Sequence, residues 1–574
     1  MQQVLRIPKR PVRRFVPENF HVTTWEKLSP FFDELMLKEW NCVAELRGWL
    51  KDLSELESII AEDLGWRYIR MTCDTTNEEH NKSYMQFVTE IQPKIAPISN
   101  ELNKKVVASP FLPELEKEEG FDIMIRSLRK SLEIYRAENV PLKTKIQQET
   151  QKYGQISGAM SIEHDGRELT LQQAAVLMQS TDRTLRKTVF DKISSRRKKD
   201  RDKLDELYNT LIDLRTQVAT NADFDNFRDY KFDAMGRFDY TAKDCFEFHE
   251  AIAKEVVPLL NNLVGERKRK LGVDELRPWD KAVDPEGKEP LKPFSTGMDL
   301  LDKSIECFHR IDPFLGQCLQ IMKGMGHLDL ESRKGKAPGG YNYPLSEIGV
   351  PFIFMNATST LRDMVTLMHE GGHAVHNFLT KDLELTDFKR TPSEVAELAS
   401  MSMELISMEH WDLFFENEDD LKRAKKDHLE QIIETLPWVA TIDKFQHWIY
   451  ENPNHTIEQR KAEWCKTMDT FGDTITEWSG LESNREYIWQ KQLHLFEVPF
   501  YYIEYGMAQL GAIAVWKNYK EDNQKGLEGY KNALKLGYKR SIPEVYEAAN
   551  IKFDFSKGYI KELMEFVKRE LDQL

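Results

Sequence analysis

The decisive stretch is Met368-His369-Glu370-Gly371-Gly372-His373-Ala374-Val375-His376. Upstream, Thr360 and Asp363 have capping-box spacing, and apolar residues then recur at intervals of three and four, which predicts a helix from residue 360 to 379. In that helix His369 and His373 lie one turn apart, about 6 Å along the axis, so both imidazoles can bind one zinc ion at roughly 2.0–2.1 Å. The neighbouring Glu370 can reach a water at the metal without binding the metal itself.

His376 shares the face of these histidines but is not predicted to be a ligand. Residues at i, i+4 and i+7 of a straight helix spread over about 10 Å, so all three cannot reach one ion. Thr391-Pro392-Ser393-Glu394 predicts the start of another helix, with Glu394 as its capping-box partner. If this helix runs back beside the first, Glu397 lies level with the histidines. Small neighbours favour Glu397 as the third ligand, the alternative being a solvated helix carboxylate.

Two further residues are predicted to support the metal ligands. Glu404 lies seven residues after Glu397, on nearly the same helix face, and can accept the N–H of a ligand imidazole. His376 is expected to support the site from the first helix.

Composition limits the class of protein. The chain has 574 residues, 41% of them hydrophobic, and a net charge of -15, which argues against nucleic acid as the main partner. Six widely spaced cysteines without Cys-x-x-Cys indicate free thiols rather than disulfides or a cysteine zinc cluster. No apolar region follows the basic N-terminus, and no apolar run is long enough for a membrane span. We expect a cytoplasmic protein without membrane partners, as a monomer or small homo-oligomer.

Long amphipathic stretches predict a mainly α-helical fold. We place a domain boundary near residue 195, between an N-terminal helical lobe over residues 1–195 and a catalytic domain over residues 196–574. Before the metal helix, a glycine-rich aromatic segment includes Gly339, Gly340 and Tyr341, and residues 351–356 form a β-like run. A small sheet here would offer an edge strand to an extended peptide. The alternative is a connecting loop that only packs the helix.

The stretch His369–His376, followed by Glu397-Leu398-Ala399-Ser400, resembles the M3 family of zinc metallopeptidases, which includes thimet oligopeptidase and the oligoendopeptidase F group. The resemblance implies His369, His373 and Glu397 as ligands of one Zn²⁺ per chain and Glu370 as the base. It also implies a two-lobed helical body with a deep central channel and a small sheet beside the zinc helix. Gly371 departs from the pattern, because the family usually has a bulkier residue there.

A second constellation lies far downstream, in His494-Leu495-Phe496-Glu497-Val498-Pro499-Phe500-Tyr501-Tyr502-Ile503-Glu504-Tyr505. A histidine beside aromatics is usually a core residue, but a zinc hydrolase also needs donors aimed at the developing oxyanion. By resemblance, His494, Tyr502 and Tyr505 are predicted to be catalytic. Substrate contacts are predicted for Gly339, Gly340, Tyr341 and Tyr501.

The sequence therefore predicts a metalloendopeptidase that hydrolyses internal bonds of short, unstructured oligopeptides. A carboxypeptidase or dipeptidyl carboxypeptidase on the same scaffold is the nearest alternative. The alternative from another class is a non-catalytic, zinc-dependent peptide-binding protein, and the presence of Glu370 counts against it.

Overall fold

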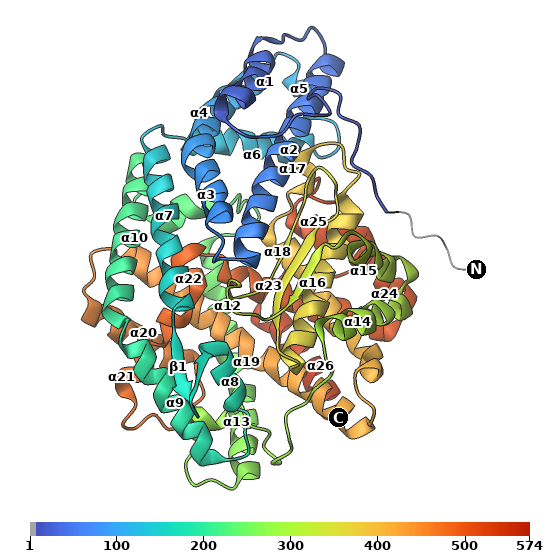
Figure 1. Ribbon diagram of the computed structural model, residues 1–574. Coiled ribbons are helices and arrows are strands. Elements are labelled where there is room, and N and C mark those ends of the chain that lie inside the picture. The colour runs from blue at the N-terminus through green and yellow to red at the C-terminus, as the bar shows by residue number, and fades with distance from the viewer. Residues whose placement is uncertain (1–6) are drawn as a thin grey trace.

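The computed structural model describes residues 7–574, which form a mainly helical molecule, as predicted, with two small sheets (Figure 1). The first helices are α1 (Trp25–Leu37), α2 (Val43–Cys73), α3 (Glu78–Gln86), α4 (Gln92–Val107), α5 (Leu112–Leu115), α6 (Phe121–Ile134) and α7 (Asn139–Gly158). Next come β1 (Ser161–His164), β2 (Arg167–Thr170), α8 (Leu171–Leu177), α9 (Arg183–Lys198), α10 (Arg201–Asn221), α11 (Phe227–Ala234), α12 (Ala242–Glu255), α13 (Val257–Leu271), α14 (Gly297–Ile311) and α15 (Pro313–Met325).

The remaining elements carry the predicted site. They are β3 (Leu328–Glu331), β4 (Tyr341–Tyr343), β5 (Phe352–Ala357), α16 (Leu361–Thr380), α17 (Thr386–Lys389), α18 (Ser393–Ser407), α19 (Glu418–Glu451), α20 (Ile457–Phe471), α21 (Glu482–Arg485), α22 (Leu493–Glu497), α23 (Tyr502–Glu521), α24 (Asn523–Lys535), α25 (Ile542–Ala548) and α26 (Lys557–Leu571).

The helices pack around two large hydrophobic cores. The smaller one lies among the N-terminal helices at the top of Figure 1 and contains buried residues from Val16 to Ile125, together with Leu385 and Phe388. The larger one contains buried residues from Ile134 to Val567. The predicted domain boundary near residue 195 falls within α9, and it stays a prediction.

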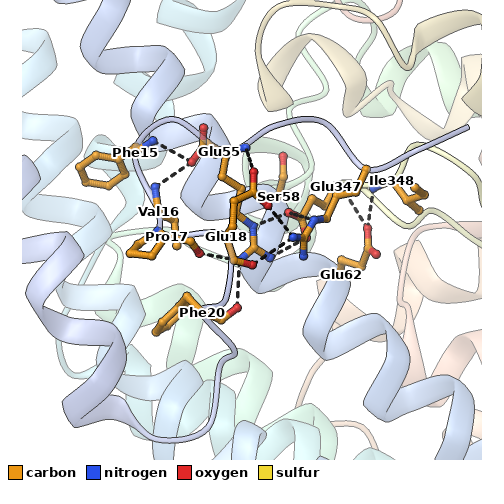
Figure 2. Close-up of polar contacts among 12 residues, drawn as sticks. Phe15, Val16, Pro17, Glu18, Phe20, Glu55, Ser58, Glu62, Glu347 and Ile348 are labelled. Atoms are coloured by element: carbon orange, nitrogen blue, oxygen red, sulfur yellow. Dashed lines mark hydrogen bonds and ion pairs between the residues drawn. The ribbon is translucent and has the colours of Figure 1, made fainter.

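The N-terminal segment connects the first core to the loop between β4 and β5 (Figure 2). Glu55 of α2 accepts a hydrogen bond from the backbone N–H of Val16 at 2.8 Å. Arg13 donates to Glu347 through Nε at 2.6 Å and Nη2 at 3.0 Å. Glu62 of α2 accepts the backbone N–H of Glu347 at 2.8 Å. The loop is thereby held against α2, which restrains the sheet beside α16.

The three-stranded sheet has the order β3–β5–β4. β5 is parallel to β3 and antiparallel to β4. The predicted strand over residues 351–356 is confirmed, because β5 covers Phe352–Ala357. It is the middle strand, however, so the edge nearest the predicted substrate residues belongs to β4, which begins at Tyr341.

α16 begins as the sequence predicted, with Thr360 and Asp363 in a capping box. It packs directly against α18. A Cβ atom on Gly372 would lie 2.6 Å from the carbonyl oxygen of Ala399 and 2.6 Å from the Cα of Ser400. The two helices can approach this closely only because α16 has a glycine and α18 has small residues at their contact.

The predicted capping role of Glu394 is wrong. α18 begins at Ser393, its N-cap is Pro392, and no side chain caps it. Glu394 is instead buried, with the Tyr240 hydroxyl donating to its Oε1 at 2.5 Å. A buried carboxylate needs such a donor, and tertiary packing supplies it here in place of the local cap.

Two expectations from composition can be compared with the fold. All six cysteines are free, as expected, and Cys245, Cys307 and Cys318 are buried. Within residues 7–574, no helix combines the length and apolar character that a membrane span requires.

Candidate metal centre and active site

Three predicted ligands meet between α16 and α18. His369 Nε2 lies 3.3 Å from Glu397 Oε2, and His373 Nε2 lies 3.7 Å from the same oxygen. One ligand atom from each residue falls within 4.8 Å of the other two. Two imidazole nitrogens and one carboxylate oxygen form the donor set of many catalytic zinc sites, which keep a further position open for substrate or water. The residues present therefore fit a zinc ion.

Other side chains hold these ligands in place. His369 Nδ1 lies 2.6 Å from Glu404 Oε1, the contact anticipated from the sequence, and this leaves Nε2 free to face the metal position. Glu397 accepts the Tyr501 hydroxyl at 2.7 Å and the Ser400 hydroxyl at 3.1 Å. Although burial acts to raise it, the pKa of Glu397 is lowered to about 2 by the facing His373 and His369 and by the Tyr501 hydrogen bond. The carboxyl group of Glu397 is therefore ionised, the form that could bind a metal ion.

Glu370 lies beside the three ligands but is not one of them. Its side chain is buried, and its Oε2 has no hydrogen-bond partner. Burial is the main cause that raises the pKa of Glu370 to about 7. A carboxylate with an unpartnered oxygen next to the metal position has the placement that a general base requires.

The structure explains the glycine that departs from the family pattern. A Cβ atom on Gly371 would lie 2.6 Å from the ring of Phe308, so Phe308 occupies the space of the missing side chain. His376 lies outside the ligand group, its Nε2 has no partner, and burial lowers its pKa to about 3. It is a neutral, buried neighbour of the site, and its supporting role stays a prediction.

Two cavities border the predicted ligands. One of about 450 Å³ is lined by β4, α16, α18 and Tyr501. The other, of about 770 Å³, is lined by α13, α16, α19, His494 and Tyr502. Both include His369, Glu370 and Tyr505 among their lining residues, so the cavities meet at the candidate metal centre.

The predicted catalytic residues His494, Tyr502 and Tyr505 also lie at the candidate metal centre. His494 Nε2 lies 3.2 Å from the Tyr505 hydroxyl, and Gln492 Nε2 lies 2.7 Å from His494 Nδ1. Because an amide nitrogen can only donate, this network assigns the ring proton of neutral His494 to Nε2. Burial lowers the pKa of His494 to about 4, so the ring is neutral near neutral pH. The ring of Tyr502 lies 4.9 Å from that of His494.

The predicted substrate contacts are distributed unevenly. Gly340, Tyr341 and Tyr501 line the first cavity, whereas Gly339 is not among its lining residues. The Tyr341 hydroxyl lies 2.6 Å from Thr72 Oγ1, and its ring stacks on Phe354, so this side chain also has a structural role. Tyr501 is tied to Glu397, which the sequence did not predict.

Two amide side chains that contact site residues were not predicted from the sequence. Asn342 of β4 donates from Nδ2 to the backbone oxygen of Glu370 at 3.2 Å, which attaches the edge strand to the metal helix. Gln492 sets the tautomer of His494. Asn342 lies in the aromatic segment already singled out, but no motif marks either amide, because each acts through a tertiary contact.

We expect Gly372→Ala to destabilise the protein and weaken metal binding. The new methyl group would meet backbone atoms of α18, which cannot rotate away, and overpacking of this kind costs about 1–3 kcal/mol. The measurement is the Tm together with the metal content of the purified variant. Gly48→Ala in α2 is the matched control, because no atom lies within 4 Å of the added methyl group, and it should not lower the Tm. Equal Tm values for Gly372→Ala and wild type would contradict the proposed helix contact.

Comparison with known proteins agrees with this geometry. The model of peptidase family M3 matches residues 176–565, and that of the peptidase M3 N-terminal domain matches residues 15–134. An oligoendopeptidase F homolog of Borreliella burgdorferi is 24% identical over 551 residues, which cover 89% of this chain and 86% of the relative. An oligoendopeptidase F homolog of Lactococcus lactis is 22% identical over 71% of this chain, and the match spans 66% of that relative.

Solved structures show the same fold. The structure of PZ peptidase A with an inhibitor superposes with a TM-score of 0.92 at 27% identity, covering 98% of this chain and 99% of the other. An oligoendopeptidase F of Enterococcus faecium, at 16% identity, has a TM-score of 0.64 over 96% of this chain and 97% of its own. The helical fold and the His-Glu-x-x-His site with its downstream glutamate define a metallopeptidase. The chain belongs to peptidase family M3, and its relatives place it in the oligoendopeptidase F group.

Proposed function

We propose that this protein is a zinc-dependent endopeptidase that hydrolyses internal peptide bonds of short, unstructured oligopeptides. The observation that carries the proposal is the meeting of two cavities at His369, Glu370 and Tyr505. A peptide lying through both cavities extends beyond the reacting bond in either direction. That arrangement suits cleavage within a chain, and a folded protein would not fit into either cavity.

His369, His373 and Glu397 would hold the zinc ion. Zinc bound there would supply Lewis-acid polarisation of the scissile carbonyl and would lower the pKa of a water molecule. Glu370 is placed to accept the proton of the attacking water through its unpartnered Oε2 and to deliver it to the leaving amine. Glu404 keeps His369 oriented through its Nδ1 contact.

His494, Tyr502 and Tyr505 are the proposed oxyanion donors. The Nε2–H of neutral His494 lies beside the Tyr505 hydroxyl, and both residues line the second cavity together with Tyr502. Donors fixed before the reaction stabilise negative charge without reorganisation. Because His494 is neutral well above pH 4, it would donate without carrying a charge.

We expect His494→Ala to lower kcat by about 10²–10³ with little change in KM, since the lost donor acts mainly in the transition state. Steady-state kinetics on a quenched fluorescent peptide measure both values. Tyr502→Phe and Tyr505→Phe, each of which removes only a hydroxyl, identify the tyrosine that shares the role. An unchanged kcat in His494→Ala would remove this residue from the mechanism.

The edge strand β4 is the proposed binding strip for the substrate backbone. β4 pairs with β5 along one edge only, and Gly340 and Tyr341 line the first cavity beside it. An extended peptide could add to the open edge through main-chain hydrogen bonds. Asn342 holds this strand against the metal helix at the backbone of Glu370, so the bound peptide would run past the base.

One observation favours a second candidate function. Lys381, Lys389 and Arg390 are among the residues that line the first cavity, where a cation could bind the C-terminal carboxylate of a substrate. A carboxypeptidase or dipeptidyl carboxypeptidase would need such a contact.

A peptide blocked at both ends separates these functions. We expect an N-acetylated, C-amidated peptide of about ten residues to be cut internally, and mass spectrometry of the products gives the cleaved bond. Cleavage only of the free-acid form, with one or two residues released, would establish the exopeptidase. Tight binding of both peptides without any product from the zinc-loaded protein would favour a peptide-binding protein.

The expected location and assembly remain proposals. We propose a cytoplasmic monomer or small homo-oligomer without nucleic-acid or membrane partners, on the grounds of its acidic charge and its free cysteines.

A further inference from the structure

A second group of potential metal ligands lies outside the active site, between α12 and α19. Cys245 and His249 are four residues apart on α12, and Asp443 and His447 have the same spacing on α19. Residues four apart share a helix face, so each helix presents two ligand types to the other. Cys245, Asp443 and His447 each offer a ligand atom within 4.8 Å of the other two. The cluster is entirely buried.

The distances in this cluster resemble those of the candidate catalytic centre. Asp443 Oδ2 lies 2.9 Å from His249 Nε2 and 3.2 Å from His447 Nε2. Atoms that share a tetrahedral ion at about 2.0–2.3 Å lie about 3.3–3.8 Å apart, so only small adjustments are needed. His447 Nε2, despite its proximity, makes no hydrogen bond with Asp443. His249 Nε2, in contrast, hydrogen-bonds to Asp443 Oδ2 at 2.9 Å, so His249 is a partner of the carboxylate and lies outside the three-residue ligand group.

The cluster also contains several unpartnered polar atoms. Both ring nitrogens of His447, Nδ1 of His249 and Oδ1 of Asp443 are buried without a hydrogen bond. His447 and His249 are each 1% exposed, and Asp443 is 0% exposed. Most buried polar atoms in proteins have a partner, and leaving one unsatisfied costs about 1–3 kcal/mol. Because an imidazole binds an ion through one nitrogen only, an ion in this cluster would satisfy one ring nitrogen of His447 and one oxygen of Asp443.

Charge balance identifies the class of that ion. Within residues 7–574, the ion-pair partners of Asp443 are the two histidines, with no lysine or arginine among them. Burying a carboxylate without a full counter-charge is costly. A divalent cation with one thiolate, one carboxylate and one neutral imidazole forms a neutral unit, which suits a buried position. A sulfur, a nitrogen and an oxygen donor together favour zinc.

We propose that Cys245, Asp443 and His447 bind a second zinc ion that clamps α12 to α19, while His249 orients Asp443 through the hydrogen bond between them. The Cys245 thiol would lose its proton on binding, and the metal would enter before or during folding, because the site is closed. No residue of this cluster belongs to the catalytic ligand group.

The clamp would support the active site from behind. His447 packs against the ring of Phe500 with centroids 5.3 Å apart, and the neighbouring Gln446 accepts the Phe500 backbone N–H at 2.7 Å. Phe500 has a left-handed backbone with φ of 66°, and it directly precedes Tyr501, which donates to Glu397. Fixing α19 would therefore help to hold the turn that places Tyr501.

Cobalt substitution tests the proposal directly. The catalytic ligand set contains no sulfur, so a thiolate-to-cobalt charge-transfer band in the near ultraviolet can arise only from a cysteine-containing site. We expect this band in the cobalt-loaded full-length wild type and about two zinc equivalents per chain in the zinc form. Cys245→Ser should abolish the band and lose about one zinc equivalent. Cys318→Ser, another buried cysteine outside the cluster, is the control and should keep both.

Two further comparisons make the result decisive. Glu397→Ala should lose activity but keep the thiolate band, so failure of the catalytic proposal can be distinguished from failure of this one. With zinc bound, the Tm of the wild type should exceed that of Cys245→Ser. After both proteins are stripped of metal, their Tm values should be equal. Either of two results with the wild type would overturn the proposal: one zinc equivalent per chain, or cobalt absorption without a thiolate band. Both are measured on the wild type, so neither depends on whether a variant folds.

Discussion

Glu370→Gln is expected to lower kcat/KM by about 10²–10⁴, the range that general acid–base groups contribute. The amide keeps the size of the side chain but cannot accept the proton of the attacking water. Glu370 is not among the three grouped ligands, so the metal content should remain that of the wild type. The measurement is steady-state cleavage of a quenched fluorescent peptide, with metal analysis of the same preparation.

A matched control separates the loss of the base from a general loss of structure. Glu250→Gln, on an exposed face of α12, removes a carboxylate that forms an ion pair with the exposed Lys254 at 3.5 Å. It should leave the rate and the Tm unchanged, because exposed ion pairs contribute little. Wild-type activity in Glu370→Gln would show that another group transfers the proton and would sink the proposed mechanism.

Glu397→Ala is expected to lose about one metal equivalent and to lower kcat/KM by at least about 10³, since a catalytic metal supplies several kcal/mol of transition-state stabilisation. The substitution removes the oxygen that faces both His369 and His373, and it leaves the Tyr501 hydroxyl without its acceptor. Metal content by mass spectrometry and peptide cleavage measure the two effects. The size of the loss depends on Glu397 being a ligand rather than a neighbour.

Glu404→Gln provides a graded comparison. It acts on the metal only through His369, and substitutions of such supporting groups typically cost 10–100-fold, so we expect about that loss in metal affinity. Removing a metal ligand should therefore lower the metal affinity more than removing the residue that supports it. If Glu397→Ala kept its metal and activity while Glu404→Gln lost both, the assignment of the third ligand would be wrong.

Much of the metal centre was predictable because its information is local. His369, Glu370 and His373 share one helix, and the helical period alone places two imidazoles on one face and the acid beside them. Glu397 needed one further assumption, that the next helix runs back beside the first. Glycine and small residues at the contact made that assumption reasonable, and the structure packs α18 so closely against α16 that a Cβ atom on Gly372 would lie 2.6 Å from the Ala399 carbonyl oxygen.

The parts that could not be predicted depend on distant segments. Glu394 has the spacing of a capping residue, but Tyr240, far away in the sequence, supplies its hydrogen bond. Tyr501 lines the first cavity, and its contact with Glu397 was not predicted. The Cys245 and Asp443 helices are separated by nearly two hundred residues, and neither half of that cluster stands out without the other.

The sequence by itself determined the helix that carries two ligands and the base, its start, the strand before it and the family to which the chain belongs. Spacing along a helix and capping chemistry operate over a few residues, so they can be read without a fold. Only the tertiary structure decided that β4 is the sheet edge, that two cavities meet at Glu370 and that His494 reaches Tyr505. These features depend on packing between segments far apart in the chain, and packing is set by the whole core.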